Sequence, residues 1–153
     1  LLAGCGAREL GLPQVAAAVD SPDGGFRATI RNHSVLAAAR QSLWIEQVGG
    51  GRIWLANLAE DWGWCDQVVW TPDGRRVAFV VEGTDVQLYA VPGGELLQRT
   101  ELVPRAAEPA PLCASDLRLS DDGSVLTYRL CTPRGDSCAP SERVALAVPP
   151  GVS

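Results

Sequence analysis

The chain has 153 residues, with 13 arginines, no lysine, 18 acidic side chains and a formal net charge of −5 at pH 7. This length fits one domain, the 46% of hydrophobic residues excludes a disordered chain, and no stretch reaches the roughly 20 consecutive apolar residues that a membrane-spanning helix needs. The arginines are scattered singly apart from Arg75-Arg76, so no basic stripe is present and nucleic acid is not expected as a partner.

The 16 glycines and 11 prolines together exceed their usual share of a globular protein. Such a composition favours many short strands joined by tight turns over long helices. The chain contains no methionine, and we therefore expect it to begin inside a longer precursor.

The chain opens with Leu1-Leu2-Ala3-Gly4-Cys5. This opening resembles the lipobox that ends the signal peptide of bacterial lipoproteins. The resemblance implies that residues 1–4 are a signal-peptide remnant that is removed, that Cys5 is lipidated, and that residues 5–17 form a lipidated N-terminal tether. It also implies a lipid anchor in a bacterial membrane and a position on its periplasmic or cell-surface side, because several acyl chains together hold a protein stably. A buried cysteine after an apolar pair is the alternative.

The first predicted repeat covers about residues 18–62. It begins at the turn sequence Asp20-Ser-Pro-Asp-Gly24, and strands are predicted over 26–31, 42–48 and 52–58, with Gly49-Gly50-Gly51 as a turn. The Ala-rich stretch 35–40 is ambiguous. Residues 10–18 could add a strand beside the last repeat.

The second predicted repeat covers about residues 63–103. Turn signals divide it into four predicted strands, over 67–70, 76–81, 85–91 and 95–102. Its first turn has the sequence Trp70-Thr71-Pro72-Asp73-Gly74, in which Pro presets φ, Asp caps the backbone and Gly adopts positive φ.

The third predicted repeat covers about residues 112–153, after a Pro-rich connector over 103–111. Its turn sequence ends in Asp122-Gly123, strands are predicted over 124–131 and 143–148, and a fourth strand is missing.

The three turns recur at a nearly constant interval, since Asp23, Asp73 and Asp122 are separated by 50 and 49 residues. The central segment, residues 68–80, resembles the repeat of TolB-type and WD-repeat-like β-propellers, whose signature is Trp-Ser/Thr-Pro-Asp-Gly between two strands. The resemblance implies propeller blades and places Trp70 in the core.

We therefore expect an all-β fold in which residues 18–153 form one domain of three propeller-like four-stranded antiparallel repeats. A closed propeller needs at least four blades, so the expected form is an incomplete, open β-propeller. An open arc exposes two flanks that a partner or a second copy can cover. A compact β-sandwich or barrel is the alternative.

Four cysteines remain beside Cys5, an even number in a protein expected outside the cytoplasm, where disulfides are the usual fate of cysteines. Three pairings are possible for Cys65, Cys113, Cys131 and Cys138. Pro133 and Gly135 favour the pair Cys131–Cys138, which leaves Cys65 with Cys113. Zinc is the competing use, but no Cys-x-x-Cys is present, so no metal is expected.

No motif for catalysis stands out. His33 is the single histidine and we expect it on a polar surface, no cysteine is free as a nucleophile, and the acidic residues lack the spacing of a calcium loop. The prediction is that the chain is not an enzyme and binds no cofactor.

Partner-binding residues are expected in two places. Trp62 and Trp64 follow Glu60-Asp61 in a predicted loop, and tryptophan is enriched in binding hot spots. Arg134 and Asp136 lie in the loop between Cys131 and Cys138. The predicted function is that of a lipid-anchored extracytoplasmic interaction module, an accessory or scaffolding subunit on the outer face of a bacterial membrane protein complex. The alternative is a lipoprotein that binds cell-wall sugar or another small ligand.

Overall fold

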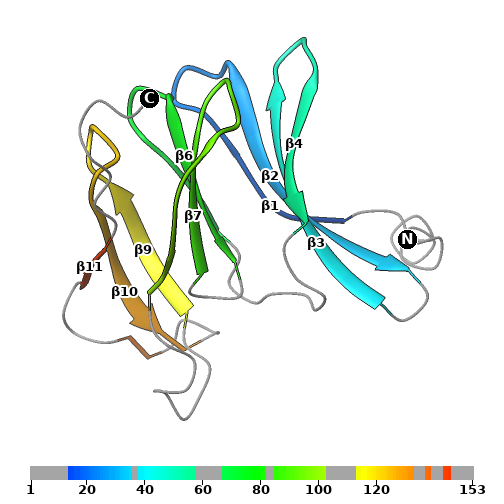
Figure 1. The fold of residues 1–153 in the computed structure, drawn as a ribbon. Helices are drawn as coiled ribbons and strands as arrows, with labels where there is room; N and C mark the ends of the chain where they lie inside the picture. Colours follow the sequence, from blue (N-terminus) through cyan, green and yellow to red (C-terminus); the bar gives the residue numbers. More distant parts are fainter. Residues whose placement is uncertain are drawn as a thin grey trace.

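The computed structural model describes residues 14–35, 38–57, 67–81, 85–102, 113–132, 137–138 and 143–145. These residues form three antiparallel β-sheets that stand side by side in the order of the chain (Figure 1). The predicted all-β class is confirmed. Each described sheet has two edge strands, so none closes into the barrel that was the alternative.

The first sheet is a four-stranded meander in which each strand pairs with the next along the chain. Its strands are β1 (Gln14–Asp20), β2 (Phe26–Val35), β3 (Ala38–Gln47) and β4 (Arg52–Asn57). Residues 14–17, which were expected in the tether, belong to β1. The described part of the strand expected over 10–18 beside the third repeat instead pairs with β2, since Gln14 and Ala18 lie directly across from Asn32 and Thr29.

The second sheet is a meander of the same kind. Its strands are β5 (Gln67–Trp70), β6 (Arg76–Val81), β7 (Asp85–Ala90) and β8 (Leu96–Glu101). The bounds predicted for the first two of these strands are confirmed.

The third sheet has three described strands, β9 (Cys113–Leu119), β10 (Leu126–Cys131) and β11 (Arg143–Ala145). The central strand is β10, which pairs with β9 on one side and β11 on the other. In the described part of the chain, this sheet therefore has one strand fewer than the other two.

Two hydrophobic cores lie between neighbouring sheets. The first and second sheets enclose Ile30, Leu43 and Phe79, and the second and third enclose Val80, Leu88 and Tyr128, together with smaller apolar residues of the same strands. Strand β6 contributes to both cores, because successive side chains of a strand point to opposite faces. Its odd-numbered residues Val77, Phe79 and Val81 pack on the first sheet, and its even-numbered residues Ala78 and Val80 pack on the third.

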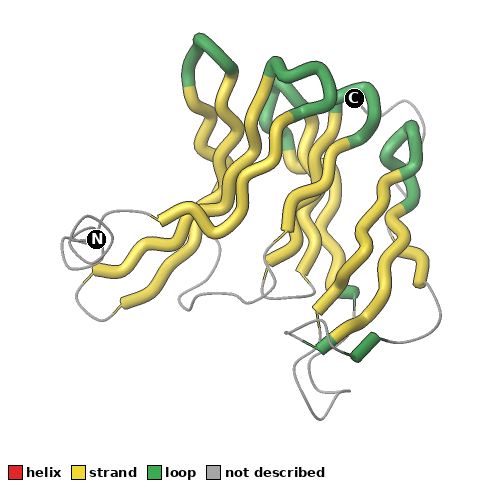
Figure 2. The backbone as a smooth tube through the Cα atoms, turned by 180° about the vertical axis from the view of Figure 1, so that it is seen from behind, coloured by secondary structure: helices red, strands yellow, loops and turns green. Residues whose placement is uncertain are grey.

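The sheets approach one another most closely through their first strands, since β5 contacts β1 and β2 on one side and β9 on the other. The turns that follow β1, β3, β5, β7 and β9 lie at one end of the sheets, the upper end in Figure 2. The described residues include no helix that is long and apolar enough to cross a membrane.

Candidate functional site

Three turns with the same hydrogen-bond pattern lie in a row at the upper end of the sheets. In each turn, one carboxylate oxygen of an aspartate accepts a hydrogen bond from the hydroxyl two positions earlier, at 2.6–2.8 Å, and from the amide N–H two positions later, at 2.9–3.0 Å. The aspartates are Asp23, Asp73 and Asp122. This pattern explains why the turn sequence recurs, because the short side chain closes the turn on its own backbone.

These hydrogen bonds favour the ionised carboxylates. The hydroxyl and amide of Ser124, with the hydroxyl of Ser120, lower the pKa of Asp122 to about 2. The Ser21 hydroxyl and the Gly25 amide lower the pKa of Asp23 in the same way. The row of turns therefore carries negative charge at neutral pH.

Neighbouring turns contact each other from sheet to sheet. A Cβ atom placed on Gly74 would lie 3.7 Å from the Ser21 side chain, and one on Gly123 would lie 3.0 Å from the side chains of Thr71 and Arg76. Both glycines have positive φ, 71° and 72°. The Arg76 guanidinium also donates a hydrogen bond to the backbone carbonyl of Asp122. Each turn thus packs against the turn of the preceding sheet.

A cleft of about 730 Å³ opens beside these turns. Its walls combine apolar and charged groups from all three sheets, and they are formed by Asp23, Phe26, Asp73, Gly74, Arg75, Arg76, Ala90, Val91, Pro92, Gly93, Glu95 and Asp122. In the described part of the chain, no three His, Cys, Asp or Glu residues gather as a metal site would require. The aspartates of this cleft are engaged in closing their turns.

Side chains of β5 hold the first strands of the sheets together. The Trp70 indole Nε1 donates to the carbonyl of Val19 at 2.9 Å, and the Gln67 amide donates to the carbonyl of Ala114 at 2.7 Å. Trp70 is 8% exposed and packs in the core between the first and second sheets, where the resemblance placed it.

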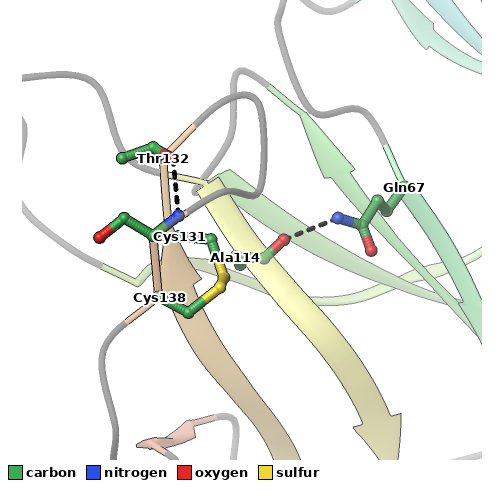
Figure 3. Close-up of a disulfide and its surroundings, with 6 residues drawn as sticks. Gln67, Ala114, Cys131, Thr132 and Cys138 are labelled. Atoms are coloured by element: carbon green, nitrogen blue, oxygen red, sulfur yellow. Dashed lines mark hydrogen bonds between the residues drawn. A yellow bond between two sulfur atoms is a disulfide. The ribbon is translucent and has the colours of Figure 1, made fainter.

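A disulfide joins Cys131 to Cys138 beside the third sheet (Figure 3). The Thr132 hydroxyl accepts a hydrogen bond from the Ser137 amide at 3.3 Å, which supports the closure of the loop. Cys113 lies across from Cys131 in the sheet and is also disulfide-bonded, with a partner outside the described residues.

The outer face of the first sheet is polar at positions where the other sheets are apolar. Three residues of β6, and three of β10, pack against the preceding sheet: Val77, Phe79, Val81 and Leu126, Tyr128, Leu130. The corresponding residues of β2, 50 positions before those of β6, are Arg27, Thr29 and Arg31. Asp20 likewise occupies the position of Trp70, where it pairs with Arg27 at 2.6 Å. In this row of the outer face, all four described residues are therefore polar or charged.

Trp44 lies on this same face and is half-buried. It pairs across the strands with Thr29, its indole Nε1 donates to the Ser42 hydroxyl at 2.7 Å, and the Arg31 guanidinium lies 5.8 Å from the ring centre. The apolar strand predicted around Trp44 gave no sign that the ring would face away from the other sheets. Aligning the three repeats residue by residue would have revealed this face.

The outer face of the third sheet is polar in the same manner. Equivalent cross-strand pairs of the three sheets are Val19–Ala28, Val69–Ala78 and Arg118–Thr127. Ile30 and Val80 correspond in sequence to Arg129. Ala78 and Val80 pack on the following sheet, whereas their counterparts in the third sheet are Thr127 and Arg129.

Several predicted site residues lie outside the described residues, namely Cys5, Trp62, Trp64, Cys65, Arg134 and Asp136. His33 belongs to β2 and lies across from Arg40, at a strand position where a polar loop was expected.

Comparison with known proteins reveals a likeness of fold. No protein-family model and no curated protein matches the sequence. Among solved structures, the chain is similar to the acylaminoacyl peptidase of Pyrococcus horikoshii, with a TM-score of 0.52 and 9% identity over 91% of this chain. It is also similar to the β-propeller domain of the Trilobed protease from Pyrococcus furiosus, with a TM-score of 0.48 and 10% identity over 87%. A third is the hydrazine synthase of Kuenenia stuttgartiensis, with a TM-score of 0.41 and 12% identity over 78%.

The chain spans 26%, 43% and 44% of the lengths of these three proteins, in that order. One of the three is described as a β-propeller domain. The prediction that the chain is not an enzyme is contradicted, because a peptidase contains a part with this fold. That prediction considered only catalytic motifs within this chain, whereas a fold serves in proteins of many activities.

Proposed function

We propose that the chain is a lipid-anchored extracytoplasmic interaction module, an accessory or scaffolding subunit that docks on the outer face of a bacterial membrane protein complex. In this proposal, residues 1–4 are removed, acyl chains on Cys5 hold the protein in the membrane, and the three sheets are propeller-like repeats of an open arc. Trp62 and Trp64 are its first candidate contacts, and Arg134 and Asp136 are the second.

The observation that supports docking is the chemistry of the two outer faces of the arc. Positions that are apolar between sheets carry Arg27, Thr29 and Arg31 at one end and Thr127 and Arg129 at the other. Terminal repeats with polar outer faces are typical of arrays that end at that point. Such faces fit contact with a different protein better than apolar packing against a fourth blade.

A lipid anchor would make this docking efficient. Confinement to the membrane raises the effective concentration of the module near its partner, so modest contacts suffice for stable association.

The proposal is tested on protein from the native membrane. Mass spectrometry of the N-terminus should find an acylated Cys5, and the Cys5→Ser variant should leave the membrane fraction. After mild detergent extraction, the wild-type chain should elute from gel filtration with a complex much larger than 16.2 kDa. An unmodified Leu1 in the mature protein would refute the anchor. A free monomer that binds peptidoglycan would refute docking and favour the sugar-binding alternative.

A further inference from the structure

The two outer faces of the arc differ in how their charges are satisfied. On the first sheet, Arg27 pairs with Asp20 at 2.6 Å and Arg31 pairs with Glu46 at 2.5 Å. Asp20 lies directly across from Arg27 in the sheet. Glu46 lies four residue pairs from Arg31 along the β2–β3 ladder. This face therefore supplies its own counter-charges.

The third sheet has no such arrangement. Its outer face carries Ser115, Arg118, Thr127 and Arg129, in the cross-strand pairs Arg129–Ser115 and Thr127–Arg118, and we call these four residues the third-sheet face. Among the described residues, neither arginine has an ion-pair or hydrogen-bond partner. Arg118 is exposed, and Arg129 is half-buried with its Nε atom inaccessible and without a hydrogen bond.

An acidic residue, Asp116, also belongs to β9. Asp116 lies in the bulge between the two cross-strand pairs, has a φ of 53° and is exposed, and it forms no ion pair with either arginine. Two guanidinium groups thus stand on a sheet face of a chain whose net charge is −5. An arginine that replaces an apolar residue, without an acid beside it, has its planar donors available for an anion.

We infer that the third-sheet face docks an acidic surface of a partner protein, whose Asp or Glu carboxylates pair with Arg118 and Arg129. This inference rests on the proposed function and names the docking face and the chemistry of the partner. Arg118 and Arg129 are diagonal neighbours on adjacent strands, which places such residues about 7–8 Å apart. Two carboxylates on one strand or helix face of a partner match that separation.

An acidic protein fits this face better than an anionic membrane does. Recognition of anionic lipids by surface charge takes clusters of about 4–8 basic residues. The third-sheet face has two, and the rest of the chain is acidic. A carboxylate also matches the fork of a guanidinium with two parallel hydrogen bonds, so two arginines give both affinity and orientation.

The face is continuous with the loop that was expected to make contacts. Cys131 ends β10 two residues after Arg129, and its disulfide to Cys138 closes the loop that contains Arg134 and Asp136.

The test compares Arg118→Glu with Arg75→Glu in full-length protein in native membranes. Both arginines are exposed, and both substitutions change the charge by the same amount, but Arg75 lies in the cleft beside the turns. After mild detergent extraction, the share of chain that elutes with the large complex should fall about tenfold for Arg118→Glu and stay within twofold for Arg75→Glu. Arg118→Lys, which keeps the charge but lacks the planar fork, should bind less well than the wild-type chain and better than Arg118→Glu, and raising the salt concentration should release the wild-type chain.

The outcomes separate the inference from the proposed function. If the wild-type chain never elutes with a complex, the proposed function fails. If it does, and Arg118→Glu elutes with it equally well, the inference is wrong while the function stands. Sedimentation with phosphatidylglycerol vesicles, using the Cys5→Ser chain, tests the membrane: binding that Arg118→Glu abolishes would overturn the acidic protein partner. Circular dichroism should show an unchanged β spectrum for every variant, because Arg118 and Arg75 are exposed.

Discussion

A methyl group added at Gly123 tests whether the turns at the end of the sheets support one another. Gly123 has a φ of 72°, and a Cβ there would lie 3.0 Å from both the Thr71 Cγ2 and the Arg76 Cδ atoms. An L residue at positive φ costs about 1 kcal/mol relative to glycine. A contact this short forces the neighbouring side chains to move, which adds about 1–2 kcal/mol. We therefore expect Gly123→Ala to lower the free energy of unfolding by about 2–3 kcal/mol.

Gly24→Ala is the matched control. Gly24 occupies the equivalent turn of the first sheet with a φ of 74°, and no atom lies within 4 Å of the Cβ position. Gly24→Ala should therefore lower the free energy of unfolding only by the cost of an L residue at positive φ, about 1 kcal/mol.

Urea denaturation, followed by circular dichroism and tryptophan fluorescence, measures both variants against the wild-type chain. For a domain of this size, 1 kcal/mol corresponds to about 2–4 °C in melting temperature, so thermal melting should show the same order. Equal losses for Gly24→Ala and Gly123→Ala would refute the idea that the turns brace each other from sheet to sheet.

Three further substitutions test other contacts of the fold. Trp70→Phe removes the indole donor to the Val19 carbonyl and should lower the free energy of unfolding by about 1–2 kcal/mol in urea. Replacing Cys131 and Cys138 together by serine should cost about 2–3 kcal/mol, because the bond closes a short loop in the unfolded chain, and dithiothreitol should narrow the difference from wild type. The pKa of Asp122 is about 2 in the folded chain, below the 3.8 that is usual for an aspartate. Its ionised form therefore stabilises the fold fully above about pH 4, and this contribution should disappear as the pH falls towards 2. The Asp122→Asn variant should lose less stability over that pH range.

Each of these expectations has a result that would contradict it. A Trp70→Phe variant as stable as the wild type would mean that the indole hydrogen bond contributes nothing to holding the first two sheets together. An unchanged stability of the cysteine double variant under oxidising conditions would contradict loop closure by Cys131 and Cys138. If the free energy of unfolding fell equally with pH in the wild type and in Asp122→Asn, the Asp122 carboxylate would not favour the folded state.

The second sheet could be predicted from the sequence because local signals agree there. Trp70-Thr71-Pro72-Asp73-Gly74 contains every residue type that its turn needs, and the apolar alternation on both sides of it marks the strands. The other two turns share this residue pattern. The nearly constant interval between the three turns predicted three repeats that follow one another along the chain.

The pairing of the first strand of the first sheet was predicted wrongly for a physical reason. Residues 14–20 are rich in alanine and lack alternation, and Val15, Ala18 and Val19 are exposed, so no buried face shows in the sequence. Their strand structure comes from pairing with β2, which is a tertiary effect. Pairing also decided the ambiguous Ala-rich stretch after residue 34, since Val35 and Ala38 pair in the hairpin of β2 and β3.

The polar outer faces could not be predicted without knowing which residues pair between neighbouring strands. Arg27, Thr29 and Arg31 alternate with Ala28 and Ile30, a pattern typical of any strand with one side in water. Their significance emerges only when each is placed opposite its counterpart in the next repeat, where Val77, Phe79 and Val81 are buried. The contacts between sheet faces, and not the strand pattern, reveal how this face differs from those of the other sheets.

The two-sided burial of β6 has a consequence for the growing chain on the ribosome. The first two sheets contain all the residues of their own core, so they can associate once residue 102 has emerged. At that moment, Ala78, Val80, Val86 and Leu88 still lack their contacts with the third sheet, which follows later in the chain. A nascent or truncated chain that stops there exposes an apolar sheet surface. Chaperones bind such surfaces, and such surfaces also promote aggregation. The core between the second and third sheets is therefore complete only after the strands of the third sheet have been made.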